Sequence, residues 1–254
     1  MSIKALAVKV PAITIFFWII KVLSTTVGET LADYLNSTLG FGDNGTIVLM
    51  SSVLVVLLAC QLLVKKYIPS IYWTALVCIS TVGTLITDYL HANLNMQNWQ
   101  LTILFGLILL IIFAVWWNQE KTLSIKTINT RKRESFYWLA VLSTFAMGTA
   151  AGDIFLDDLG VPLLVSTFVF LGVIGLIALL WRVKIIGQVL SFWLIYILTR
   201  PLGASFGDYL SLGKDESPDA LGLGAQNVSI VFISLIVVLV LYLTLSKRDV
   251  IKLD

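Results

Sequence analysis

The sequence predicts an all-α membrane protein in which eight transmembrane helices form four parallel two-helix repeats, the odd-numbered helices making the inner bundle. Its 254 residues are 58% hydrophobic and 13% charged, with a mean hydropathy of +0.95, which excludes an ordinary soluble domain. Eight apolar stretches are long enough to cross a hydrocarbon core of roughly 30 Å. In addition, one spacing of Trp, Gly and Asp occurs four times.

All eight stretches are expected to be helices, because none has the period-2 alternation of a membrane β-barrel. The first carries Lys21 and Glu29, and the seventh carries Arg200 beside Pro201. The even-numbered stretches have almost no charge and contain long aliphatic runs such as 53–58 and 107–112, so we expect them to face lipid. In chain order the predicted spans are about 12–35, 46–64, 69–90, 101–118, 136–156, 161–181, 185–210 and 228–246.

The repeated spacing divides the chain into four units. Successive repeat tryptophans are 55, 65 and 55 residues apart, which groups the units as two halves joined by a basic loop at 119–135. Because each unit has two spans, all four enter the membrane in the same direction around an axis along its normal. The predicted repeats within the single membrane domain 1–254 are about 11–67, 68–120, 131–183 and 184–248.

Each odd-numbered span has a glycine followed four residues later by a small residue or a threonine. Such positions allow helix backbones to approach closely in lipid. We therefore expect the odd helices to pack together at Gly28, Gly83, Gly148 and Gly203.

Basic residues indicate the topology. Fourteen of the 17 Lys and Arg residues, among them Lys4 and Lys252, lie on one side of the predicted spans, and the opposite loops contain only Lys214. By the positive-inside rule both termini are expected in the cytoplasm. The outer loops are acidic, with Asp43, Asp157, Asp158, Asp215, Glu216 and Asp219.

The four repeat aspartates lie at the same height, near the outer ends of the odd helices. Carboxylates crowded around a shared axis must hold protons, pair with bases or bind a cation. Oxygen ligands favour manganese, magnesium, calcium, sodium or a proton over copper or zinc, and a divalent metal is our preferred interpretation. An alternative is that each Asp caps a short outer turn. The predicted cation-binding residues are Asp33, Asp88, Asp153, Asp208 and Glu29.

Two bases inside the spans are expected to tune this charge. The first span carries one polar stripe of residues spaced by four, namely Lys21, Thr25, Glu29 and Asp33. This stripe predicts either a Lys21–Glu29 ion pair or a proton or ion relay leading away from the aspartates. Arg200 is expected to pair with Glu29 or with a repeat aspartate.

The four-repeat pattern, with stretches such as Phe17-Trp18, Gly148-Thr-Ala-Ala-Gly152-Asp153 and Thr199-Arg200-Pro201-Leu-Gly203, resembles a bacterial family of membrane proteins catalogued as a repeat of unknown function. The resemblance covers nearly the whole chain. It implies a multi-pass protein of the bacterial cytoplasmic (inner) membrane and brings no substrate or mechanism.

The leading functional hypothesis is a transporter or channel-like permease for a small hard cation, and the alternative is a non-transporting membrane scaffold or accessory subunit held by ion pairs. An enzyme is not expected, because the chain has no phosphate-binding loop, Ser/His/Asp set or zinc spacing. The expected partners are the lipid bilayer and the cation, with no cofactor and no nucleic acid. A homo-oligomer is left open.

Overall fold

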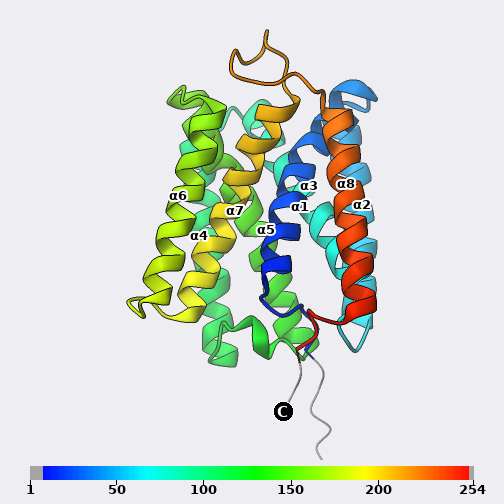
Figure 1. The fold of residues 1–254 in the computed structure, drawn as a ribbon, viewed down its shortest axis with the longest axis vertical. Coiled ribbons are helices and arrows are strands. Elements are labelled where there is room, and N and C mark those ends of the chain that lie inside the picture. Colours follow the sequence, from blue (N-terminus) through cyan, green and yellow to red (C-terminus); the bar gives the residue numbers. More distant parts are fainter. Residues whose placement is uncertain (1–7, 252–254) are drawn as a thin grey trace, which may run out of the picture.

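The computed structural model describes residues 8–251, apart from the side chains of Ser37 and Asp43. This part of the chain consists of helices and their connecting loops, without strands, and contains eight helices long and apolar enough to cross a membrane (Figure 1). The predicted fold class is thereby confirmed. The helices are α1 (Ile15–Asp33), α2 (Gly42–Leu63), α3 (Pro69–Leu94), α4 (Asn98–Glu120), α5 (Arg131–Asp153), α6 (Leu163–Arg182), α7 (Gln188–Ser211) and α8 (Ala225–Ser246), with π-helical turns η1 (Tyr34–Thr38) and η3 (Ile154–Asp158) and a 3-10 turn η2 (Ile125–Thr127).

The odd helices form a closed inner ring. Helix α1 packs against α3, α3 against α5, α5 against α7, and α7 against α1. Each even helix covers the odd helix that follows it, so that α2 lies on α3, α4 on α5, α6 on α7, and α8 on α1. The odd spans are 56–72% buried and the even spans 17–28% buried, which confirms the predicted inner bundle. The inner helix of each repeat is therefore covered by the outer helix of the preceding repeat.

Glycines determine how closely the inner helices approach. A Cβ atom built on any of the four repeat glycines would lie 2.0 to 2.8 Å from a side-chain atom of the next odd helix, closer than real Cβ contacts allow. The partner always occupies the position three residues before the next repeat's glycine, and the series closes from the fourth repeat to the first. The four contacts are Gly28 with Ser80, Gly83 with Phe145, Gly148 with Arg200, and Gly203 with Thr25.

Residues spaced by four stack in layers along the inside of this ring, because four residues make about one helical turn. From one end, the layers contain Phe17, Lys21, Thr25, Glu29 and Asp33 of α1 together with their repeat equivalents. Every side chain in the first three layers is buried. These layers are Phe17, Tyr72, Tyr137 and Phe192; then Lys21, Leu76, Val141 and Tyr196; then Thr25, Ser80, Phe145 and Arg200.

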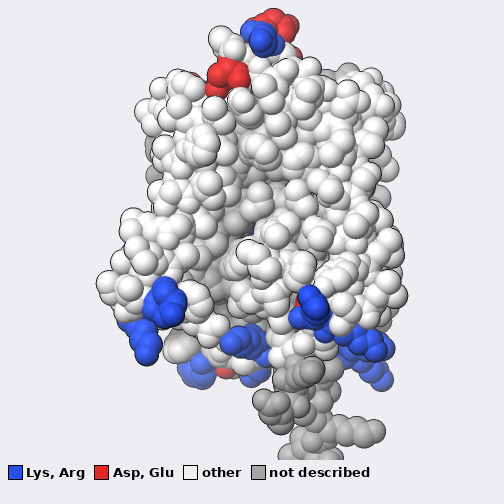
Figure 2. Space-filling model, viewed as in Figure 1, with Lys and Arg blue, Asp and Glu red and all other residues white. Residues whose placement is uncertain are grey.

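Charge is segregated between the two ends of the bundle. Figure 2 shows Lys and Arg at the end where the α6–α7 connection and the end of α8 lie, acids and one cluster of basic atoms at the other end, and a broad uncharged band between them. We call these the basic end and the acidic end. Lys4 and Lys252, predicted at the basic end, lie outside the described residues, as does the side chain of Asp43.

The basic end is closed by the segment before α1, which is hydrogen-bonded to the α4–α5 connection and to the segment after α8. The Lys9 backbone N–H donates to Ile128 O at 2.8 Å, and that of Ala12 donates to Asp249 O at 2.7 Å. The buried Lys9 side chain forms an ion pair with Glu134 of α5, which also accepts a hydrogen bond from Gln61 at 2.9 Å. This network ties the start of the chain to α2 and α5.

Candidate functional site

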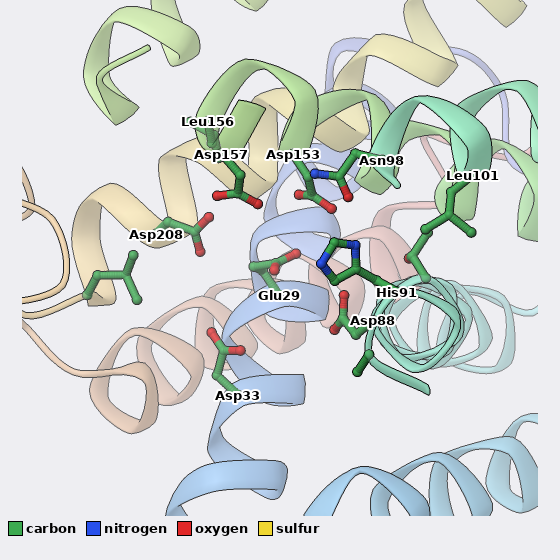
Figure 3. Close-up of a pocket in the computed structure, with 13 residues that line it drawn as sticks. Glu29, Asp33, Asp88, His91, Asn98, Leu101, Asp153, Leu156, Asp157 and Asp208 are labelled. Atoms are coloured by element: carbon green, nitrogen blue, oxygen red, sulfur yellow. The ribbon is translucent and has the colours of Figure 1, made fainter. Parts of the chain in front are cut away.

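An open cavity of about 430 Å³ lies at the acidic end, between the outer turns of the inner helices. The four repeat aspartates and Glu29 all line it, so the structure brings the predicted cation-binding residues together. Figure 3 shows Glu29 in the middle, with Asp33, Asp88, Asp153 and Asp208 arranged around it. Asp88 is exposed, and the other four carboxyl groups are half-buried.

The aspartates share a cavity without forming a metal coordination sphere. Among residues 8–251, no group of three or more His, Cys, Asp and Glu side chains is arranged to hold a metal ion. The physical reason is that the four short side chains extend from four separate helices around the ring. The expected cluster is thus an acidic vestibule lined by separate carboxyl groups.

The structure contradicts the alternative that the aspartates cap outer turns. Asp33 and Asp153 stand immediately before the π-helical turns η1 and η3, yet neither side chain makes a capping hydrogen bond. Asp88 and Asp208 lie within α3 and α7, so no helix begins after them. The four carboxyl groups are directed into the cavity instead.

Arg200 lies directly below the cavity and is fully buried. Its guanidinium donates to Glu29 and to the Thr84 hydroxyl, to Thr149 Oγ1 at 3.0 Å, and to the Thr25 carbonyl oxygen at 3.3 Å. Since Thr84 and Thr149 are the repeat equivalents of Glu29, the guanidinium is held from three repeats at one height. The Arg200–Glu29 ion pair, one of the predicted pairings, therefore joins α7 to α1 and forms the floor of the cavity.

Lys21 does not pair with Glu29, and that prediction is wrong. Its ammonium group lies 4.0 Å from the ring centroid of Phe145 and 4.1 Å from that of Tyr196, and its side chain is fully buried. Within the described part of the chain its Nζ has no hydrogen-bond partner. The reason is height, because Lys21 lies roughly 12 Å of helix rise below Glu29 whereas Arg200 lies one layer below it.

Sequence reasoning missed two groups of polar residues. One is a pair of phenols, Tyr72 and Tyr137, whose hydroxyl groups are hydrogen-bonded to each other deep in the bundle. The other is His91, which lies in the last turn of α3 and lines the cavity. Extending the spacing of four from α1 to the other odd helices would have found the phenols.

The family described as Repeat of Unknown Function (DUF347) matches the chain four times, at residues 16–67, 71–122, 136–184 and 191–249. No curated protein and no solved structure matches the chain. The four matched segments each contain most of one inner helix and the whole outer helix that follows it.

Proposed function

The chain belongs to this family of membrane repeats, and from that premise we propose that it is an integral membrane permease for a small hard cation. The observation that carries the proposal is the charge of the cavity. Six carboxyl groups line it, those of Glu29, the four repeat aspartates and Asp157, and the ion pair at its floor supplies one guanidinium. Such an excess of negative charge in a membrane protein attracts cations and favours proton binding.

The chemistry of the lining favours a hard cation. Carboxylate and amide oxygens from Glu29, the repeat aspartates and Asn98 surround the cavity, and its volume of about 430 Å³ leaves room for a cation with bound water. We propose a divalent metal, manganese first, with magnesium, calcium, sodium and protons as the ions to compare. No enzymatic step and no nucleic acid partner belong to this proposal.

The distribution of charge supports an orientation. With the basic end in the cytoplasm, both termini are cytoplasmic and the cavity opens to the outside of the bacterial cytoplasmic membrane. Entry of a cation next to Glu29 would compete with Arg200 for the same carboxylate. Weakening that pair releases a contact between α1 and α7, and this is the step through which cation binding would open the floor.

The proposal is tested by reconstituting the purified protein into vesicles and measuring entry of Mn²⁺, Mg²⁺, Ca²⁺ or Na⁺ down an imposed gradient. Asp153→Asn and Asp208→Asn are expected to abolish entry while the protein remains folded, because each removes a charge from the cavity. Asp215→Asn is the matched control, since Asp215 is an exposed acid of the same end outside the cavity lining. Wild-type vesicles that admit none of these ions would contradict the proposal.

A scaffold or accessory subunit is the second candidate, favoured by the way Arg200 binds backbone or side-chain oxygen atoms of α1, α3 and α5. In that case the ionisable groups serve only to join the helices. The scaffold hypothesis expects the aspartate variants to change protein abundance or thermal stability, whereas the permease hypothesis expects them to change ion entry at equal abundance.

A further inference from the structure

Polar groups continue below Arg200 along the inside of the ring. Lys21 of α1 and Tyr196 of α7 occupy equivalent positions in one layer, and Tyr72 and Tyr137 occupy equivalent positions in the next layer toward the basic end. All four side chains are fully buried. An ionisable group at this depth is costly and requires a functional or structural reason.

We propose that Lys21 and the phenols of Tyr196, Tyr137 and Tyr72 carry protons between the acidic cavity and the basic end of the bundle. This inference rests on the proposed permease function and deepens it, because it couples cation entry to a proton moving the opposite way. The route begins at the Arg200–Glu29 pair in the cavity floor, passes the buried and unpartnered Ser80 hydroxyl in the layer between Glu29 and Lys21, and ends at Tyr67 and Asp249.

The surroundings of Lys21 suit a group that gains and loses a proton. The ring faces of Phe145 from α5 and Tyr196 from α7 stabilise an ammonium ion by cation–π attraction. Leu76 of α3 and Val141 of α5, in the same layer, are apolar and offer the group no hydrogen bond. No acid among the described residues holds the group permanently charged, since its Nζ has no ion pair or hydrogen bond.

The phenols connect this layer to the basic end. The hydroxyl groups of Tyr72 and Tyr137 are hydrogen-bonded to each other, and the buried Tyr196 hydroxyl, one layer nearer the cavity, has no hydrogen-bond partner among the described residues. The ring of Tyr72 packs edge-on against Tyr67, with their centroids 5.7 Å apart. The proposed route passes from α7 to α5 to α3 and then to the α2–α3 connection, and the hydrogen bonds already formed along it are Tyr72–Tyr137 and Tyr67–Asp249.

Asp249 provides the end of the route at the basic end. The Tyr67 hydroxyl donates to Asp249 Oδ2 at 2.5 Å and accepts from Trp73 Nε1 at 3.1 Å. Burial raises the pKa of the Asp249 carboxyl, so it binds and releases a proton nearer to neutral pH than an exposed aspartate. Burial also raises the pKa of Tyr67, which keeps that phenol neutral and able to donate.

The proton balance of the route is simple. Each phenol oxygen accepts one proton and releases the proton it already carried to the next group, so it ends neutral and unchanged. Lys21 alternates between an amine and an ammonium group, and Asp249 alternates between a carboxylic acid and a carboxylate. No group is oxidised or reduced, and one proton leaves at one end for each proton that enters at the other.

The test uses vesicles containing the full-length protein, Mn²⁺ as the probe and a pH-sensitive dye inside. The wild type is expected to move protons outward as Mn²⁺ enters. Lys21→Met and Tyr137→Phe are expected to lose this proton flux while still exchanging radioactive for unlabelled Mn²⁺ at equal concentrations, a process that needs no net proton movement. Tyr242→Phe, on the outer helix α8 and 37% exposed, is the matched control.

The outcomes separate this inference from the permease proposal. Wild-type protein that exchanges no Mn²⁺ overturns the permease function itself. Normal proton flux in folded Lys21→Met and Tyr137→Phe, or Mn²⁺ entry in the wild type without proton flux, overturns the proton route alone. Tyr137→Phe removes a single hydroxyl oxygen and keeps the ring, so it decides the question even if Lys21→Met fails to fold.

Discussion

At the scale of single residues, one position of the repeat carries four different side chains. Thr25, Ser80, Phe145 and Arg200 are equivalent, and each packs against the glycine of the preceding repeat. The backbone contact is therefore common to all four repeats, whereas the chemistry differs. Only Arg200 brings charge to this layer, and it meets Glu29, the only acid among the four equivalents one layer above.

Arg200→Gln is expected to destabilise the protein strongly, by about 3–5 kcal/mol, because it leaves the Glu29 carboxylate beside buried hydroxyl groups without its cation. The measurement is the unfolding midpoint of the purified protein in detergent. Adding Glu29→Gln removes the unpaired charge, so the double variant should recover part of the loss. A double variant as unstable as Arg200→Gln alone would show that the ion pair is not the cause.

At the scale of helices, close approach depends on the repeat glycines. A Cβ at Gly203 would lie 2.0 Å from Thr25 Oγ1 and 3.0 Å from the Thr26 backbone nitrogen, so α1 and α7 would have to separate. A Cβ at Gly207, one turn further, would lie 3.3 Å from the Cγ2 atom of Thr26. The outer helices are different, since the space around Gly172 and Gly175 of α6 is open.

We therefore expect Gly203→Ala to lower stability by roughly 1–3 kcal/mol through overpacking. Gly175→Ala, the same substitution on a lipid-facing helix, should change stability by no more than about 0.5 kcal/mol. Both values come from unfolding midpoints measured side by side. Equal effects of the two substitutions would mean that helix propensity, and not the contact with Thr25, governs the result.

At the scale of the whole molecule, the repeats interlock. Helix α4 of the second repeat covers α5 of the third, and α8 of the fourth covers α1 of the first, where Thr30 and Ser229 share a hydrogen bond of 2.7 Å. Neither half of the chain can bury its polar inner face without the other. The acidic cavity also needs both halves, because Asp33 and Asp88 come from one and Asp153 and Asp208 from the other.

When the chain is divided within the loop at 121–130 and its two halves are produced together, they should accordingly associate. We expect a tag on the first half to co-purify the second half from detergent extracts, and either half produced alone to be degraded or aggregated. The full chain carrying the same tag is the control for extraction. Stable halves that fail to co-purify would contradict the interlocked ring.

The sequence predicts features that lie within single helices, and predicts less well which side chains meet across the axis of the ring. The eight spans follow from hydropathy, and the parallel repeats and inner odd helices follow from a spacing that recurs in each unit. The meeting of Asp33, Asp88, Asp153 and Asp208 at one cavity follows from their equal height and from the ring's symmetry. The pairing of Arg200 with Glu29 was one of two alternatives that charge alone allowed.

By itself, then, the sequence determined the membrane architecture, the axis and the height at which each polar layer lies, because these depend on patterns within single helices. Only the tertiary structure decided which side chains meet across the axis. It placed Lys21 between two aromatic rings, joined Tyr72 to Tyr137, and held the aspartates around a cavity without a coordination sphere. The physical reason is that contacts across a ring depend on which helices are neighbours and how closely glycines let them approach, and neither quantity is present in one helix alone.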